Sequence, residues 1–203
     1  DSRSYLRFFL SKVRSVFHRK NLTHQRTSIL HLQVPLPACS NLQIHPSQAD
    51  NRNLYPLHPV CYKISKEAIA AVDFISYQCY GPSPVRFPME KYCSDIQMAL
   101  AYGIPKEKLV AGVPFYGVTK DGSKKTEAYF SFVQDGLITG PAQNEVTYKG
   151  DVYVFDGQNN IRAKTRYAMD QQLKGMMSWD LATDMPLNDS RSLFKTMVEE
   201  LGR

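Results

Sequence analysis

Several residue types and patterns that mark particular protein classes are scarce in this sequence. Its 203 residues include four cysteines, 11 glycines and one tryptophan. No two cysteines form a C-x-x-C pair, which argues against a zinc site or another metal site. Cys79 lies within an apolar run, so we expect small buried thiols rather than a disulfide framework. No glycine-rich loop follows a predicted strand, and this absence argues against a nucleotide-binding sheet and its cofactor.

Long hydrophobic runs and clustered positive charge are also missing. No run approaches the roughly 18 to 20 apolar residues that span a bilayer. Arg3 and Arg7 interrupt the first ten residues, where a signal peptide has its apolar stretch. Residues 1–68 carry a net charge of +7 and the remainder −1, which gives the net +6 of the chain. Because the basic residues form no compact cluster, the sequence predicts neither a membrane nor a nucleic-acid partner.

The apolar periodicity alternates between helix and strand. It predicts a helix over 6–17, a strand over 28–35 and then a polar loop, with prolines, to about Cys61. Later helices are expected over 64–71 and from Pro88 to the stop at Gly103. Two more are expected, one over 161–173 capped by Asn159 or Asn160, and a final helix capped by Asn188 or Asp189. Strands are expected over 72–80, 109–117 and 175–179.

This alternation predicts an α/β fold, because parallel strands need helical crossovers. The missing phosphate loop favours a barrel over a doubly wound sheet. Residues 118–160 contain their own elements, namely a helix near 126–134 and a hairpin of 145–149 and 152–155 around Gly150-Asp151. We therefore expect one domain over 1–203 that carries a small α+β insertion over 118–160.

Four segments resemble the second half of the catalytic barrel in glycoside hydrolase family 18, the chitinase-like enzymes. Residues 72–80 (VDFISYQCY) resemble the sixth strand of that family, residues 108–117 (KLVAGVPFYG) the seventh, and residues 175–181 (GMMSWDL) the eighth. Residues 163–168 (AKTRYA) resemble the helix that leads into strand eight. The resemblance implies a partial TIM (β/α)8 barrel, strands five to eight, with strand five at 28–35 and the insertion between strands seven and eight.

The family signature Asp-x-x-Asp-x-Asp-x-Glu, whose last residue is the general acid, does not occur in this sequence. The strand assignment places it just upstream of Asp1, so we expect a piece that begins after the catalytic strand. No catalytic residue is assigned within the chain.

The resemblance implies substrate-assisted hydrolysis, in which the N-acetyl oxygen of the sugar attacks the anomeric carbon. Gln78 and Tyr80 lie two residues apart and share one face of a strand. If that face is the barrel interior, the Tyr80 hydroxyl donates to the acetamido oxygen and Gln78 holds a neighbouring group. The alternative is that Tyr80 fills the barrel end. Gly81 stands where many family members have Asp.

Aromatic residues at the strand ends complete the expected substrate site. Trp179 is expected to stack under a sugar ring. Phe115 and Tyr116 end strand seven, and by alternation only one of them faces inward. Asp180 replaces a more usual Glu, and Val118 replaces a frequent Arg. Acidic residues of the insertion, such as Asp151 and Asp156, are expected to be solvated.

The sequence thus predicts part of a glycosidase acting on β-1,4-linked N-acetylglucosamine in chitin, chito-oligosaccharides or the N-glycan core. The alternatives are a non-catalytic chitinase-like lectin and a truncated gene product without activity. No cofactor is implied, the oligomeric state is not indicated, and the family resemblance implies secretion or a periplasmic location.

Overall fold

The computed structural model describes residues 31–34 and 64–202, the first range as backbone only. Its elements, in chain order, are β1 (His31–Val34), α2 (Lys66–Ala71), β2 (Phe74–Gln78), η2 (Pro84–Arg86), α3 (Met89–Tyr102), η3 (Lys106–Lys108), β3 (Leu109–Pro114), β4 (Tyr116–Thr119), β5 (Thr126–Ala128), α4 (Tyr129–Gln134), β6 (Glu145–Tyr148), β7 (Asp151–Val154), α5 (Gln158–Asp170), β8 (Gly175–Trp179), η4 (Leu181–Thr183) and α6 (Leu193–Leu201). The predicted helix over 6–17 and the loop to Cys61 lie outside these residues.

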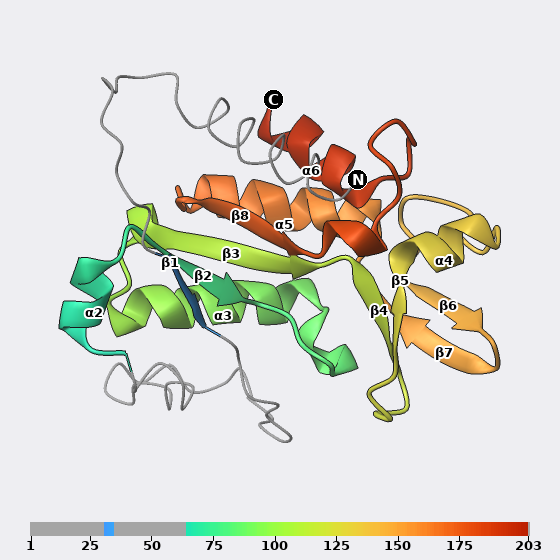
Figure 1. Ribbon diagram of the computed structural model, residues 1–203, viewed down its shortest axis with the longest axis horizontal. Helices are drawn as coiled ribbons and strands as arrows, with labels where there is room; N and C mark the ends of the chain where they lie inside the picture. Colours follow the sequence, from blue (N-terminus) through green and yellow to red (C-terminus); the bar gives the residue numbers. More distant parts are fainter. Residues whose placement is uncertain (1–30, 35–63, 203) are drawn as a thin grey trace.

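Four strands form an open parallel sheet in the order β1-β2-β3-β8 (Figure 1). The register pairs Ser76 with Val110 and Gly112 with Met177. Every residue of β3 is buried, as expected for a central strand with an uninterrupted apolar sequence. Helices connect the parallel strands, so the predicted α/β class is confirmed.

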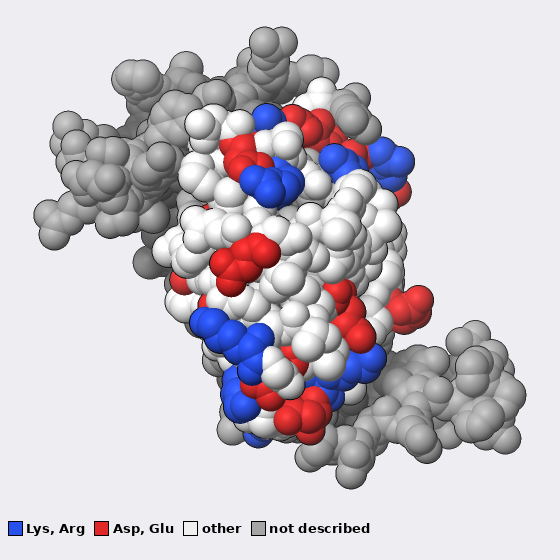
Figure 2. Space-filling view, turned by 90° about the vertical axis from the view of Figure 1, so that its right-hand side faces the viewer, with Lys and Arg blue, Asp and Glu red and all other residues white. Residues whose placement is uncertain are grey.

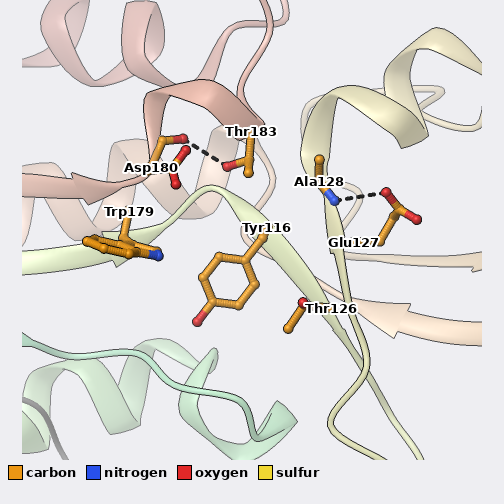
Figure 3. Close-up of a pocket in the computed structure, with 7 residues that line it drawn as sticks. All are labelled: Tyr116, Thr126, Glu127, Ala128, Trp179, Asp180 and Thr183. Atoms are coloured by element: carbon orange, nitrogen blue, oxygen red, sulfur yellow. Dashed lines mark hydrogen bonds between the residues drawn. The ribbon is translucent and has the colours of Figure 1, made fainter. Parts of the chain in front are cut away.

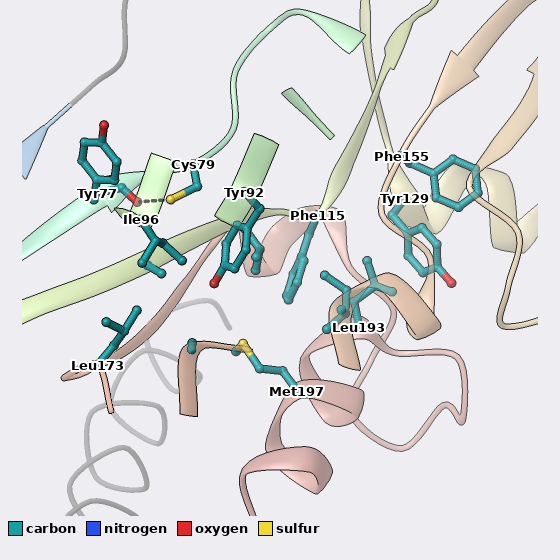
Figure 4. Close-up of a cluster of buried hydrophobic side chains, with 14 of the residues drawn as sticks. Tyr77, Cys79, Tyr92, Ile96, Phe115, Tyr129, Phe155, Leu173, Leu193 and Met197 are labelled. Carbon is teal, nitrogen blue, oxygen red and sulfur yellow. Dashed lines mark hydrogen bonds between the residues drawn. The ribbon is translucent and has the colours of Figure 1, made fainter. Parts of the chain in front are cut away.

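The helices pack on one face of this sheet and form the main core with it (Figure 4). Tyr77 and Cys79 of the β2 segment belong to this buried cluster, together with Tyr92 and Ile96 of α3 and Leu193 of α6. Strand alternation therefore turns the neighbouring residues, including Gln78, to the opposite face. Cys79 is a buried free thiol and Cys93 a partly buried one, as expected for these two.

A second sheet lies beyond the carboxyl end of β3, at the right-hand end of Figure 1. It is antiparallel and has the order β5-β4-β7-β6. The predicted single strand over 109–117 is wrong, because the chain leaves the parallel sheet at Phe115 and begins β4 at Tyr116. The predicted helix over 126–134 is also partly wrong. Its first three residues form β5, which pairs with β4, and only Tyr129–Gln134 is helical.

Capping and turn residues differ from expectation in three places. Gly157, not Asn159 or Asn160, precedes α5, and Ser192, not Asn188 or Asp189, caps α6 by accepting from the Lys195 amide. The β6–β7 hairpin turns at Lys149 and Gly150, which both have positive φ, as a type I′ turn requires. The predicted C-terminal stop of α3 is confirmed, since Gly103 has φ 104°.

The face that carries the antiparallel sheet shows blue and red groups side by side and no broad area of one sign (Figure 2). Exposed pairs at this sheet include Lys120–Glu145 at 2.6 Å and Lys125–Asp151 at 2.7 Å. Such pairs contribute little to stability because water screens them. Among the described helices, none has the length and apolar character needed to cross a membrane.

We predict that Gly112→Ala destabilises the chain by about 1–3 kcal/mol. A Cβ atom at Gly112 would lie 2.8 Å from Tyr80 Cε1 and 3.0 Å from the Tyr77 carbonyl oxygen. Gly140→Ala is the matched control, because nothing lies within 4 Å of its added Cβ. Chemical denaturation measures both variants, and equal stabilities would contradict the packing described for Tyr80.

Candidate functional site

A hollow of about 340 Å³ opens where the two sheets meet (Figure 3). One side is formed by the end of β8 and the turn after it, and the other by the paired strands β4 and β5. The lining residues are Tyr116, Thr126, Glu127, Ala128, Trp179, Asp180 and Thr183. The rings of Trp179 and Tyr116 extend into the same space from these two sides, whereas the Glu127 side chain turns away from it.

The turn after β8 holds Trp179 by backbone contacts. The Trp179 carbonyl accepts from the Phe115 amide at 2.8 Å, which extends the β3–β8 ladder by one bond. Asp180 Oδ1 accepts from the Ala182 amide at 2.8 Å, and Thr183 Oγ1 donates to the Asp180 carbonyl at 2.8 Å. The peptide bond between Trp179 and Asp180 is cis. Trp179 nevertheless remains 49% exposed, so its backbone is fixed while the residue is accessible.

Tyr80 lies behind Tyr116 at the carboxyl end of β2. The two rings meet edge to face with centroids 6.3 Å apart. The Tyr80 hydroxyl donates to Met177 Sδ at 3.8 Å, and sulfur is a weak acceptor. Only 5% of Tyr80 is exposed, and it is not among the residues that line the hollow.

Burial keeps both phenols neutral. It raises the pKa of Tyr80 well above the usual range, an effect that Tyr116 reinforces and a hydrogen bond with the Gln78 side chain opposes. Burial also raises the pKa of Tyr116 to about 12, with the Arg86 charge acting in the opposite direction. Both hydroxyls therefore remain available as hydrogen-bond donors at physiological pH.

The sequence-predicted site residues fall into three groups. Tyr116 and Trp179 line the hollow, Tyr80 packs against Tyr116, and Gln78 lies beside Tyr80. Phe115 is fully buried and points toward the helices (Figure 4). Alternation thus selects Tyr116, not Phe115, as the residue that faces the hollow.

Sequence reasoning missed Thr126, Glu127, Ala128 and Thr183. The first three belong to β5, which was predicted as part of a helix, and their approach depends on the pairing of Tyr116 with Ala128. Glu127 is turned toward the first turn of α4, because Oε1 accepts from Ser131 Oγ at 2.8 Å and from the Ala128 amide at 3.1 Å. No sequence signal near these residues indicates a site.

The expectation that Asp156 is solvated is wrong. Asp156 is 1% exposed and pairs with Lys164, which is fully buried, at 2.6 Å. Burial raises the pKa of Asp156, and the Lys164 charge and its hydrogen bond oppose this shift. Asp151, in contrast, is partly exposed and pairs with Lys125. Within the described residues, no group of three or more His, Cys, Asp or Glu residues is arranged to hold a metal ion.

Comparison with known proteins finds matches to one family. The sequence model named Glycosyl hydrolases family 18 matches residues 2–184. The GH18 chitinase ChiB of Flavobacterium johnsoniae is 26% identical, with a TM-score of 0.53 over 68% of this chain and 45% of its own. The chitinase-like agglutinin of Robinia pseudoacacia is 18% identical, with a TM-score of 0.57 over 71% of this chain and 52% of its own.

A third structure was solved with a saccharide. A mutant of catalytic domain 2 of the Ostrinia furnacalis Group II chitinase, in complex with penta-N-acetylchitooctaose, is 16% identical, with a TM-score of 0.53 over 67% of this chain and 50% of its own. The chain therefore spans about half the length of these matched structures. The matched range covers most of the sequence, and with it the predicted resemblance is confirmed: the chain belongs to glycosyl hydrolases family 18.

Proposed function

We propose that this chain supplies the sugar-binding half of a family 18 catalytic barrel acting on β-1,4-linked N-acetylglucosamine. In this proposal β1, β2, β3 and β8 are strands five to eight of the (β/α)8 barrel, and residues 118–160 are a rim insertion. Their parallel order and the position of the antiparallel sheet between β3 and β8 support this assignment. Active sites of such barrels lie at the carboxyl ends of the strands, where the hollow is found.

The exposed indole of Trp179 is the observation that carries the proposal. Large aromatic side chains are normally mostly buried, yet Trp179 is 49% exposed and lines the hollow. Its backbone is fixed by the bond to Phe115 and by the turn at Asp180. A rigid, accessible aromatic face stacks on the apolar face of a pyranose ring at small entropic cost.

The phenols provide the polar contacts in this proposal. Family 18 hydrolysis uses the acetamido oxygen of the sugar as nucleophile, so that oxygen must be held close to the anomeric carbon. In this proposal the Tyr80 hydroxyl exchanges its contacts with Met177 Sδ and the Gln78 side chain for the acetamido oxygen, which requires the buried ring to become accessible to the sugar. Tyr116 borders the same space, and Gln78 orients the Tyr80 phenol.

The described carboxylates at the hollow are not placed to protonate a leaving group. Asp180 is directed to the amide of its own turn, and Glu127 to Ser131 and its own strand. The sequence also lacks the Asp-x-x-Asp-x-Asp-x-Glu motif that carries the general acid. We therefore propose that this polypeptide binds the glycan and that hydrolysis requires an acid from outside it.

A glycan-binding protein without hydrolysis is the second candidate. It is favoured by the match to the Robinia pseudoacacia agglutinin, whose fold is as similar as those of the chitinases. A lectin needs the aromatic surface and the phenols but no proton donor. The residue at the last position of the Asp-x-x-Asp-x-Asp-x-Glu motif, which lies outside this sequence, discriminates between the two candidates: a Glu there indicates a hydrolase, and a substituted residue indicates a lectin.

Titration with N-acetylchitotetraose is expected to change the fluorescence of this chain saturably. Trp179 is the only tryptophan, so the signal reports on the hollow alone. Trp179→Ala should weaken binding about tenfold by calorimetry, equivalent to about 1.4 kcal/mol. Met169→Ala, which removes an apolar side chain that is 40% exposed on α5, is the control. Equal loss in both variants, or binding of cellotetraose with the same affinity, would refute the proposed site.

The chain alone should not release chromophore from a chromogenic chitobioside. No described carboxylate points into the hollow in a position to act as the acid. The assay measures absorbance over time, and an inactivated chitinase of the same family is the blank. Saturable turnover that Tyr80→Phe reduces would show that the chain contains its own acid.

The glycan affinity is expected to stay constant up to about pH 10 and then to fall together with the fold. The pKa of an unfolded tyrosine is about 10, whereas burial raises that of Tyr116 to about 12. A raised pKa means that the folded state favours the neutral phenol, so this contribution to stability is complete below pH 10 and is lost as the pH rises toward 12. Tyrosinate absorbance and circular dichroism measure the two events. Ionisation of Tyr116 near pH 10 with the fold intact would contradict the described burial, and Tyr116→Phe identifies its contribution.

A further inference from the structure

A buried ion pair lies outside the hollow and has no part in the proposed chemistry. The Lys164 ammonium donates to Asp156 Oδ1 at 2.8 Å, to Asp156 Oδ2 at 2.6 Å and to the Phe87 carbonyl at 2.8 Å. An ammonium has three N–H donors, and these three bonds use all of them. The geometry of the group is therefore fully determined.

These three residues come from three separate parts of the fold. Asp156 follows β7 of the antiparallel sheet, and Lys164 lies on α5, which packs on the parallel sheet. Phe87 belongs to the connection between β2 and α3. The Lys164 ammonium thus joins residues from both sheet regions and from this connection at one point.

The contact with Phe87 leads directly to the hollow. The Phe87 ring is buried and meets the Tyr116 ring edge to face, with centroids 6.4 Å apart and an interplanar angle of 89°. Tyr116 in turn meets Tyr80 edge to face at 6.3 Å. A shift of the Phe87 backbone would therefore move the phenol that borders the glycan.

The residue before Phe87 is held from the other side. Arg86 Nη2 donates to Asp95 Oδ2 at 2.6 Å, and Lys91 Nζ donates to Asp95 Oδ1 at 2.8 Å, so α3 fixes Arg86 while α5 fixes Phe87. Neighbouring residues anchored to two helices leave the connection little freedom. Stability alone does not require such an arrangement, because well-packed apolar side chains often replace a buried ion pair without loss.

We propose that Lys164, oriented by Asp156, is a positioning residue for the hollow and sets the place of Tyr116 through the Phe87 carbonyl and ring. The inference rests on the proposed function in one respect, since an effect of Lys164 on affinity requires that the hollow binds a glycan. Its effect on the Tyr116 ring does not depend on any ligand.

The test uses the 203-residue chain and two paired variants. Lys164→Met/Asp156→Asn removes both charges together, so that neither is left buried alone. Arg166→Met/Glu200→Gln is the matched control, because it removes another ion pair of α5, one that joins α5 to α6 and does not touch Phe87. Thermal melting establishes that each variant is folded.

The first measurement is made without ligand on chains labelled with fluorotyrosine. The fluorine resonance that disappears in Tyr116→Phe belongs to Tyr116. We expect this resonance to shift or broaden in Lys164→Met/Asp156→Asn and to remain unchanged in the control. An unchanged resonance in the folded Lys164 variant overturns the proposal, whether or not the chain binds a glycan.

The second measurement is the affinity for N-acetylchitotetraose, followed by Trp179 fluorescence. We expect about a tenfold loss in Lys164→Met/Asp156→Asn, a similar loss in Phe87→Leu and no loss in the control. Combining the two changes should add little, because both act through one contact. Should the Lys164 variant fail to fold, Phe87→Leu decides, and an unchanged affinity in it overturns the proposal. Failure of the unaltered chain to bind refutes the proposed function, and the fluorine resonance then decides the positioning role alone.

Discussion

The position of the hollow depends on how the chain changes sheets at Phe115. Its amide donates to the Trp179 carbonyl, and its carbonyl accepts from the Tyr129 amide at the start of α4. The same residue therefore ends the parallel ladder and begins the antiparallel region. Because its ring is fully buried among the helices, the next residue, Tyr116, is turned to the opposite side. Phe115 thus turns Tyr116 toward the hollow through its buried ring and holds Trp179 through its backbone amide.

Two kinds of contact support the aromatic residues around the hollow. On the β8 side, backbone hydrogen bonds fix Trp179. On the β4 side, rings support one another in a series from Phe87 through Tyr116 to Tyr80. Buried charge secures the first member of this series by way of Lys164. The two walls of the hollow are therefore held by different forces, directed backbone bonds on one side and ring packing on the other.

The parallel sheet could be predicted from the sequence because its signals are local. An apolar run followed by Gly-Pro after β2, the sequence of β3 and the stop at Gly103 each specify structure within a few residues. The paired strands β4 and β5 could not be found in this way. Residues 126–128 precede a helical segment and are strand only because Tyr116 and its neighbours pair with them. There the tertiary pairing of β5 with β4 outweighs the local helical pattern. The place of Thr126, Glu127 and Ala128 at the hollow could therefore not be predicted from the sequence.

The burial of individual charged side chains is the other feature that could not be predicted from the sequence. Asp151 and Asp156 have the same chemistry and lie five residues apart at the two ends of the run DVYVFD, yet one is partly solvated and the other is fully enclosed. The difference arises from Lys164, which α5 brings to Asp156 two turns later in the chain. Periodicity identifies the apolar face of a helix. A lysine on that face, such as Lys164, is nevertheless expected to be exposed, because the sequence does not show the carboxylate that pairs with it.

The close approach of Tyr80 to Gly112 constrains how this chain can vary over evolutionary time. The phenol ring occupies the space that any side chain at position 112 would need. Because a Cβ atom at 112 would also lie 3.0 Å from the Tyr77 carbonyl oxygen, a larger residue there requires both the phenol and the neighbouring backbone to move. We therefore expect substitutions at 80 and 112 to be coupled, since the missing side chain at Gly112 leaves the space that the ring on the neighbouring strand occupies.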